Sequence, residues 1–524
     1  MTLGTPIKIC LTLVIVCLLG CYAFRSFVFY RIEKKLPALL EALDKRHVDA
    51  KVAVIETSWY YNRITLKGIT FKAQDKHELP MGLMEGDISS LTLTGVELLP
   101  LLVNKDIRMD SVILNKVNIT KSGKGSELSK KTPPHYAFKF NYIKIDSLQI
   151  VDLDSLGKPI ARTQLNIETH NLSGELPLKD LSASDLTVHG LHLTLPGSLY
   201  EISSNRIYVE NMTRATIDSL KITPLYPKRE FIHKRRYETD RIECVFPSIV
   251  FEGINTPALF QHELAIREVS MAFEMSVYRD KRMPNENDFK ALPDSLLRRI
   301  PMAVTIDSIK ILDSQITYEE FAEKADSAGS VTFRNLEAKF YDISNHNAKA
   351  LELEARAKFM NDGEIRIHGT FFNSEKPHFI TGSIRNMRLA RINPMLKPAT
   401  GVSIESGQLE MMKFDFWYNN VQSDGHLSLN YHDLKLVSLR EKKRRKDRKK
   451  DKGEVVTAVA KTVLINAFIE KDLDNHDPLS KRTGTIHFVR DQEKFIFNFW
   501  WKSLLSGLKS ASGLPGANKP PQAS

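Results

Sequence analysis

The sequence predicts a mainly β protein, built as an elongated, curled antiparallel sheet of repeated strand units with an N-terminal transmembrane helix and few short helices. Three observations lead to this. Runs of alternating apolar residues, bounded by Gly, Asp, Asn and Ser, fill most of the chain after Val52, and this pattern is typical of strands. A short motif recurs along the body, and a long apolar run opens the chain.

The N-terminal segment is predicted to anchor the chain in a membrane. Residues 9–24 (ICLTLVIVCLLGCYAF) carry no charge, and the apolar run resumes after Arg25. Sixteen helical residues reach only about 24 Å, against a hydrocarbon core of about 30 Å. The span therefore has to extend to Tyr30, with Arg25 reaching toward the headgroups. A cleaved signal peptide, or lipidation at Cys21 within the lipobox-like Leu-Leu-Gly-Cys, are the alternatives.

The charges that flank this run leave its orientation open. Lys8 precedes the run, whereas four basic residues follow it, namely Arg25, Arg31, Lys34 and Lys35. Taken alone, the positive-inside rule keeps the body of the protein in the cytoplasm.

One eight-residue motif recurs along the body. Its copies are Ile107–Leu114 (IRMDSVIL), Ile143–Ile150 (IKIDSLQI), Ala215–Ile222 (ATIDSLKI) and Val304–Ile311 (VTIDSIKI). The first two serines are 36 residues apart and the next gap is 72, with a degenerate copy at Leu186–Leu195 between them. Such repetition is typical of stacked, quasi-one-dimensional architectures.

The apolar residues of each motif change parity at Asp-Ser. Ile143 and Ile145 precede the pair at one parity, and Leu148 and Ile150 follow it at the other. A bulge or bend at Asp146-Ser147 keeps all four on one face, and Asp and Ser side chains stabilise such irregularities. The alternative is that Asp-Ser ends one strand before the next begins. Both interpretations predict a sheet with one apolar face.

An apolar sheet face must be covered, yet few helices are predicted: Arg31–Arg46, Pro293–Arg299, Val455–Phe468 and Trp500–Leu508. The sheet therefore either packs on itself as a closed core or leaves a groove that suits acyl chains. In the second case the candidate groove residues are the apolar positions of the repeats, namely Ile107, Met109, Ile143, Ile145, Leu148, Ile150, Ile217, Leu220, Ile306 and Ile309.

The net charge of +11 is concentrated in one run. Residues 440–452 (REKKRRKDRKKDK) hold ten basic and three acidic residues, which leaves +4 for the rest of the chain. We interpret the run as a solvated loop, with contact to anionic lipid headgroups as the alternative. Nucleic-acid binding is not expected, because the run contains no aromatic residue. The headgroup candidates are Lys442, Lys443, Arg444, Arg445, Lys446, Arg448, Lys449 and Lys450.

No motif for catalysis, a metal or a cofactor is present. GxSxG, HExxH, P-loop and GxGxxG patterns are absent, and His262-Glu263 continues without a second histidine. Cys244 is the one cysteine outside the N-terminal apolar run, so the body can form no internal disulfide. We therefore expect neither an enzyme nor a metal or cofactor site.

The C-terminal segment predicts a short strand and then an amphipathic helix. Phe495, Phe497 and Phe499 alternate as in a strand, and apolar residues follow at helical spacing. Tryptophans beside Lys502 suit a membrane interface, and the alternative is a helix that caps the open end of the sheet. The membrane-interface candidates are Trp500, Trp501, Leu504, Leu505 and Leu508.

With these features the sequence resembles the AsmA-like envelope proteins. The resemblance rests on the N-terminal anchor, the Asp-Ser-Leu/Ile repeats and the stretch Pro293–Phe321 (PDSLLRRIPMAVTIDSIKILDSQITYEEF), and it spans residues 7 to about 509. Asn393–Leu409 (NPMLKPATGVSIESGQL) and the ending Phe495–Leu508 are similar to the version found in Bacteroidota. It is a resemblance of pattern, without a catalytic signature, and the dense basic run and short chain depart from it.

The resemblance implies a single-pass inner-membrane protein whose β-rich body lies in the periplasm, and so favours the periplasm in the question of orientation. It also implies a relation to bridge-like lipid-transfer proteins, with a taco-shaped sheet whose apolar inside takes phospholipid or another acyl-chain lipid. The expected function is binding or conducting lipid in support of outer-membrane lipid homeostasis or assembly, with envelope proteins as further partners. The alternative is a non-enzymatic scaffolding envelope protein with a closed β core.

Together these features predict seven segments along the chain. They are a transmembrane anchor (1–30), a linker helix (31–50), an N-terminal β-rich repeat region (51–290), a C-terminal AsmA-like β region (291–439), a basic disordered loop (440–453), a C-terminal helix, strand and amphipathic end (454–510) and a disordered tail (511–524).

Overall fold

A computed structural model describes residues 48–58, 62–73, 83–97, 106–122, 136–154, 156–176, 181–259, 261–286, 288–323, 325–347, 349–372, 376–438 and 483–512. The predicted anchor (1–30), the helices predicted at 31–46 and 455–468, and the basic loop (440–453) lie outside these residues. Within them, no helix combines the length and the apolar character that crossing a bilayer requires.

The described residues are mainly β, and their 21 strands belong to one mixed sheet. The chain divides into two compact units, Met1–Ile217 (unit 1) and Asp218–Ser524 (unit 2), and the division falls within β10 (Arg214–Pro224). The strands of unit 1 are β1 (Val48–Ser58), β2 (Arg63–Ala73), β3 (Leu83–Thr94), β4 (Asp106–Ser122), β5 (Tyr136–Leu153), β6 (Pro159–Leu176), β7 (Leu181–Ser182), β8 (Asp185–Thr194) and β9 (Tyr200–Glu210).

Unit 2 contains the remaining strands and the described helices. The strands are β11 (Asp240–Ile254), β12 (Glu263–Met271), β13 (Glu274–Asp280), β14 (Ala303–Phe321), β15 (Gly329–Ser344), β16 (Leu351–Phe359), β17 (Gly363–Phe371), β18 (His378–Arg388), β19 (Val402–Tyr418), β20 (Gln422–Ser438) and β21 (Thr483–Val489). The helices are α3 (Lys228–Arg235), α4 (Thr256–Leu259), α5 (Pro293–Arg298), η1 (Leu389–Ile392), α6 (Asn393–Thr400) and α8 (Ile496–Ser512).

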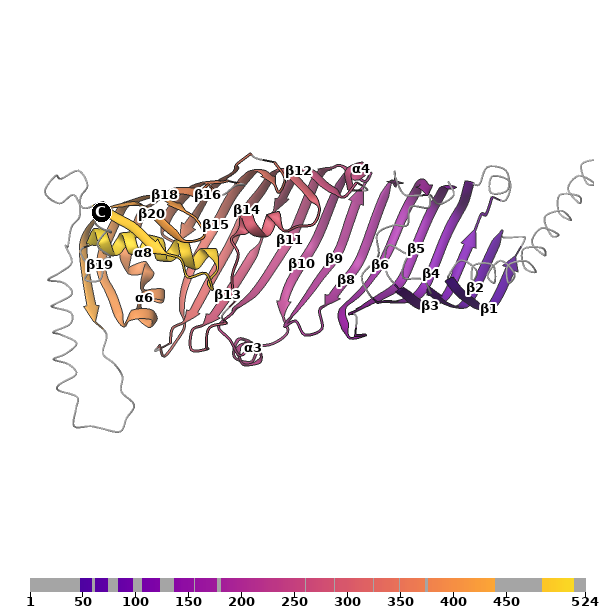
Figure 1. The fold of residues 1–524 in the computed structure, drawn as a ribbon, viewed down its shortest axis with the longest axis horizontal. Coiled ribbons are helices and arrows are strands. Elements are labelled where there is room, and N and C mark those ends of the chain that lie inside the picture. The colour runs from indigo at the N-terminus through magenta and orange to yellow at the C-terminus, as the bar shows by residue number, and fades with distance from the viewer. Residues whose placement is uncertain are drawn as a thin grey trace, which may run out of the picture. The chain divides into compact units, whose positions relative to one another are not determined.

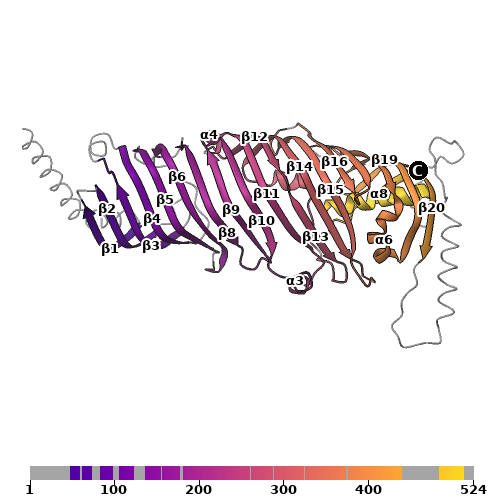
Figure 2. The same ribbon diagram turned by 180° about the vertical axis from the view of Figure 1, so that it is seen from behind.

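Neighbouring strands mostly pair in antiparallel fashion, as Figures 1 and 2 show for the succession within each unit. The prediction of a wholly antiparallel sheet is nevertheless wrong, because β4 is parallel to β5, and β14 is parallel to both β12 and β13. Parallel neighbours need a connection of a dozen or more residues. The chain has 13 residues between β4 and β5, and 22 between β13 and β14.

A row of residues in register crosses the first five strands of unit 1, and three of them are left-handed. Gly68 in β2, Lys116 in β4 and Ser147 in β5 have φ angles of 60°, 48° and 62°. The registers place them in line with Ala53 in β1 and Ser89 in β3. A left-handed residue interrupts the regular alternation of side chains along a strand. We call this row the first crease.

Apolar residues on both sides of the first crease share one face. Leu66 and Ile69 flank Gly68, and with Ile64 they form one buried cluster. Each of these three positions continues through the registers of β2 to β5 as a row. The rows that start at Ile64, Leu66 and Ile69 reach β5 at Ile143, Ile145 and Leu148. Residues in register on adjacent strands point to the same side of a sheet. The predicted bend at Asp146-Ser147 is therefore confirmed.

The bend in β5 is a bulge held by a side chain. Asp146 and Ser147 lie opposite a single residue of β6, because the register shifts between Ile145 and Leu148. The Ser147 N–H donates to Asn166 Oδ1 at 2.7 Å. This bond satisfies a backbone donor that the interrupted ladder leaves without a strand partner.

A second row of polar residues runs beside the first crease. The registers place Asp110 of β4, Asn141 of β5 and Asn171 of β6 opposite one another, and Asn171 has a φ of 52°. Asn141 Nδ2 donates to Asp110 Oδ1 at 3.2 Å, and Asn171 Nδ2 donates to Ser184 Oγ at 2.9 Å. Two such rows explain why the apolar parity changes twice along β4 and β5.

The four motif copies do not all bend at Asp-Ser. Ser219 in the third copy is left-handed, with φ 53°, like Ser147 in the second. In the first copy the left-handed residue of β4 is Lys116, outside the motif. In the fourth, the left-handed residues are Gly253 and Asp342 on neighbouring strands, in line with Asp307. In the first and fourth copies the Asp-Ser pair itself holds no left-handed residue, but Asp110 and Asp307 lie in rows whose left-handed residues are on other strands.

Substitutions at Ser147 are expected to separate backbone strain from side-chain loss. Ser147→Val places a β-branched residue at positive φ, which costs about 1–3 kcal/mol. Ser147→Gly removes the same hydroxyl but fits this backbone, so its melting temperature should equal or exceed that of the wild type. Equal melting temperatures of the valine and glycine variants in thermal unfolding would show that the position is not held left-handed.

The core of unit 2 is larger and is covered by helices of the chain. The buried cluster draws on β16, β18 to β21 and α8, with Phe416, Leu427, Ile486 and Phe499 at 1% exposure or less. Leu389 and Ile392 of η1 pack against it. The apolar face of this part of the sheet is therefore closed.

Helix α8 lies along β20 and β21, as both ribbon views show. The N–H groups of Thr485 and His487 donate to the hydroxyls of Ser510 and Ser506 at 3.0 and 3.1 Å. β21 pairs only with β20 among the described strands, so these serines satisfy its free edge. Because α8 begins at Ile496, the strand predicted through Phe497 and Phe499 is wrong. Ala511, which is fully buried, and Ser512 belong to α8 rather than to the predicted tail.

Candidate functional site

The apolar face of unit 1 carries an unbroken line of aliphatic side chains. Register by register, one residue from each of eight strands falls in this line, which we call the aliphatic ladder: Ile55, Leu66, Leu91, Leu114, Ile145, Ile167, Val188 and Ile207. At a strand spacing of about 4.8 Å, seven steps extend roughly 34 Å. No helix is among the described elements of unit 1.

The ladder has apolar neighbours on both sides. Ile64 is in register with Leu93, which continues to Val112 and Ile143. On the other side of the crease, a row joins Ile69 to Leu148, in which Ile69, Val117 and Leu148 are 8%, 4% and 7% exposed. Strands β2 to β5 thus present a band about three aliphatic residues wide.

The opposite face of these strands is charged. Lys67 Nζ lies 2.6 Å from Glu56 Oε1, and Lys144 Nζ lies 3.4 Å from Glu168 Oε1, with all four side chains at least one-third exposed. Ion pairs this exposed contribute little to stability. They do show that this face is turned to water.

The structure brings some of the predicted groove residues together and separates others. Ile143, Ile145 and Leu148 lie in the aliphatic band, and Ile150 follows them in register with Ile119. Ile107 and Met109 lie across the second row and are in register with Phe138 and Phe140. Ile217 and Leu220 flank left-handed Ser219 in β10. Ile306 and Ile309 belong to unit 2, in register with buried Ile266 and Val269.

Sequence reasoning missed part of the ladder. Ile167, Val188 and Ile207 belong to it, although none lies in a recognised copy of the full motif. Val188 lies in the degenerate copy at 186–195, so that weak repeat was the available signal.

The C-terminal candidates are placed by α8. Trp500, Leu504 and Leu508 pack against the core of unit 2, and Leu505 is partly buried. Trp501 is 39% exposed and Phe497 is 71% exposed, so they face away from that core. The basic candidates Lys442–Lys450 lie outside the described residues.

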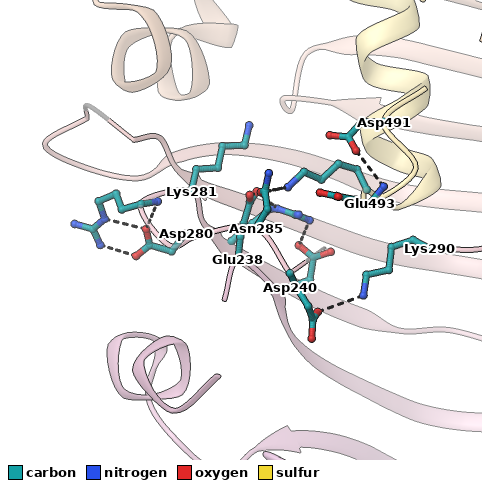
Figure 3. Close-up of polar contacts among 12 residues, drawn as sticks. Glu238, Asp240, Asp280, Lys281, Asn285, Lys290, Asp491 and Glu493 are labelled. Atoms are coloured by element: carbon teal, nitrogen blue, oxygen red, sulfur yellow. Dashed lines mark hydrogen bonds and ion pairs between the residues drawn. The ribbon is translucent and has the colours of Figure 1, made fainter. Parts of the chain in front are cut away.

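A buried ion-pair cluster joins the segment before α8 to β11 and β13 (Figure 3). Glu238 accepts from Arg279 Nε at 2.6 Å and from Lys494 Nζ at 2.7 Å, and Arg279 Nη1 donates to Asp240 Oδ1 at 3.0 Å. The side chains of Glu238 and Arg279 are each 6% exposed. Lys494 also donates to Asn285 Oδ1 at 2.6 Å.

The pKa values of the two carboxylates in this cluster are shifted in opposite directions. Burial opposes ionisation of Glu238, but the hydrogen bonds from Lys494 and Arg279 outweigh it and lower the pKa of Glu238. Burial raises the pKa of Asp240, and Arg279 offsets only part of that effect. The cluster is therefore a structural clamp built on the Glu238 carboxylate, and it presents no free acid–base pair for catalysis.

A second buried polar group surrounds Tyr418. Asp294 Oδ1 lies 3.3 Å from His378 Nε2 without forming a hydrogen bond. Arg490 Nε and Trp500 Nε1 are also buried without a hydrogen-bond partner among the described residues. Burial raises the pKa of the Tyr418 hydroxyl well above its usual range.

Chemically reactive arrangements are not evident in the described part of the chain. No group of three or more His, Cys, Asp or Glu residues there is arranged to hold a metal ion. Cys244 is 1% exposed, and burial raises the pKa of its thiol to about 11, which disfavours the reactive thiolate. Comparison with protein-family models and with curated proteins found no match to this chain.

Proposed function

We propose that this protein is a membrane-anchored envelope protein that binds or conducts lipid along the apolar face of unit 1. In this proposal residues 1–30 anchor it in the inner membrane, and its body lies in the periplasm. It supports outer-membrane lipid homeostasis or assembly, as the resemblance to AsmA-like proteins implies. The creased sheet forms a curled, taco-like groove around the acyl chains.

The aliphatic ladder is the observation that carries this proposal. Acyl chains need continuous apolar contact and no specific polar partner, and the ladder offers such contact across eight strands. The first crease and the second row, through Asp110, Asn141 and Asn171, keep apolar residues on that face where regular strands would turn them to water. An apolar sheet face that no described helix covers is suited to a ligand of the same character.

Purification of the full chain with gentle extraction, followed by mass spectrometry of bound lipid, tests the proposal. We expect phospholipid or another acyl-chain lipid to accompany the protein in a reproducible ratio. Protein that emerges free of lipid from several mild detergents would argue against it.

A scaffolding role with a closed β core is the second candidate. The observation that favours it is the core of unit 2, which η1 and α8 close with the chain's own side chains. If unit 1 closes in the same way, the protein acts through its surface on envelope partners. Absence of lipid in the experiment above, with a stable folded protein, would favour this candidate.

The topology of the proposal makes a separate prediction. A reporter enzyme that works only outside the cytoplasm, fused after Ser512 at the end of α8, should be active. The physical reason is that the apolar N-terminal run acts as an anchor or export signal. Activity of a matched reporter that works only in the cytoplasm, at the same fusion point, would contradict the periplasmic location.

A further inference from the structure

The positive charge of this protein has a second centre at helix α3. Residues 219–237 (SLKITPLYPKREFIHKRRY) hold six Lys or Arg residues and one Glu, which is a net charge of +5. Residues 440–452 carry +7 of the total of +11, so the residues outside both segments together carry −1. The excess positive charge is thus confined to these two segments, and α3 is the one that the structure describes.

Helix α3 is anchored so that its basic side chains face outward. Phe231 and Ile232 are 1% and 2% exposed and hold the helix to unit 2. Pro227 precedes the helix, and Arg236 ends it in the left-handed conformation. Arg229 and Arg235 are exposed, as is Arg236. Both ribbon views draw α3 beyond the ends of the strands near β11.

Of the five cations in α3 and its C-cap, two are neutralised within the protein and three are not. Lys228 is paired with Glu319, and Lys234 lies 3.7 Å from Glu230 and over the Tyr226 ring. Among the described residues, the side chains of Arg229, Arg235 and Arg236 have neither an ion pair nor a hydrogen bond. Guanidinium groups bind phosphate oxygens through two parallel N–H donors, so three unpaired ones on an eight-residue helix and its C-cap favour a phosphate-rich partner.

Exposed apolar side chains flank the basic helix. Leu225 before it and Tyr237 after it are 45% and 46% exposed. Basic residues beside a partly exposed aliphatic and aromatic residue are typical of segments that rest on a membrane surface. Protein surfaces that bind nucleic acid instead offer several aromatic side chains for base stacking. Among the described residues near α3, Tyr237 is the one aromatic side chain that is exposed.

We propose that α3 and its flanks form a docking surface for the phosphate groups of an anionic phospholipid bilayer. Arg229, Arg235 and Arg236 bind the headgroups, and Leu225 and Tyr237 enter the interfacial layer. The surface is peripheral, because the apolar residues of the helix itself are committed to unit 2. This interaction is independent of the proposed lipid path in unit 1.

Vesicle capture by the full chain tests this docking surface. The chain is immobilised through a C-terminal tag, and the Lys and Arg residues of 440–452 are replaced by Gln so that only α3 is compared. The readout is the ratio of vesicles with phosphatidylglycerol to vesicles of phosphatidylcholine alone, so that any insertion of the N-terminus, which does not depend on headgroup charge, cancels. Each cation near an anionic surface contributes roughly fivefold in binding.

Arg229→Glu with Arg235→Glu should therefore lower this ratio by about 25-fold or more. The matched control is Lys139→Glu with Lys158→Glu, which makes the same charge change at exposed positions of unit 1 and should leave the ratio close to that of the parent. Circular dichroism and melting of both variants confirm that they are folded.

Three outcomes would overturn the docking surface. The first is equal capture by the α3 variant and the parent. The second is an equal loss in the control variant, which would indicate net charge alone. The third is complete displacement of the vesicles by inorganic phosphate or by double-stranded DNA at matched ionic strength, which would assign the arginines to another phosphate source.

Discussion

Ile145→Asp is expected to abolish lipid binding in protein that still folds. Ile145 lies in the aliphatic ladder between Leu114 and Ile167. A carboxylate there must lose its hydration against hydrocarbon without a partner, which costs a few kcal/mol. We expect co-purifying lipid, measured by mass spectrometry, to fall at least tenfold, which corresponds to about 1.4 kcal/mol, and the variant should fail to complement an outer-membrane permeability defect.

Gln149→Asp is the matched control for Ile145→Asp. Gln149 is exposed on the same strand, so the added charge stays in water. Lys144→Asp, also on the outer face, is a poorer control, because it would place a carboxylate beside Glu168. If Ile145→Asp reaches wild-type abundance and melting temperature and retains its lipid, the ladder is not a lipid path and the scaffold candidate takes its place.

Glu238→Gln is expected to cause the largest loss of stability among single substitutions outside the apolar cores. It leaves Arg279 with Asp240 alone and Lys494 with the neutral Asn285. Removing one partner of a buried ion pair costs about 3–5 kcal/mol, because the remaining charge stays desolvated. Chemical denaturation monitored by tryptophan fluorescence, with Trp500 and Trp501 in α8 as nearby probes, measures the loss.

An exposed ion pair provides the comparison for Glu238→Gln. Glu56→Gln breaks the contact with Lys67, whose side chain is 48% exposed, and should change stability by no more than about 1 kcal/mol. Equal effects of the two substitutions would show that the cluster around Glu238 is accessible to water.

The same cluster predicts how stability depends on pH. The folded pKa of Glu238 lies below its unfolded value, so its contribution is present above the ordinary glutamate pKa and is lost as the pH falls through the folded pKa. Asp240 acts in the opposite sense, because its folded pKa is raised. Below about pH 4.5 the wild type should therefore lose more stability on acidification than Glu238→Gln does. Parallel curves for the two proteins would contradict this assignment.

Much of the β architecture is readable from short-range pattern. Alternation of apolar residues locates most strands, and the parity change at Asp146-Ser147 locates a bulge. The helix at Pro293–Arg299 is present as α5, and the helix at the C-terminus is present as α8. These features depend on a few adjacent residues, so local sequence is sufficient to predict them.

The first residue of α8 and the face that it buries could not be predicted from local sequence pattern. Its buried stripe continues from Phe499 through Ser503 and Gly507 to Ala511. A search for large apolar residues passes over these three, and their smallness matters only because β20 and β21 approach closely. A Cβ on Gly507 would lie 2.7 Å from Ile486.

The basic helix α3 was overlooked for a related reason. Its two apolar residues are adjacent and give no helical periodicity, and the +5 of its neighbourhood is hidden by a balanced average over the chain. Only the fold shows that Phe231 and Ile232 are buried while the arginines around them are exposed.

The sequence by itself determined that this protein is mainly β, that its strands carry an apolar face, and that Ser147 interrupts the alternation, because each depends on the order of neighbouring residues. The tertiary structure decided which strands are parallel, which eight residues form the aliphatic ladder and which charges meet at Glu238. Those features join residues that are far apart in the chain, up to 256 positions for Glu238 and Lys494. Strand register and long-range packing bring them together, and no local pattern encodes either.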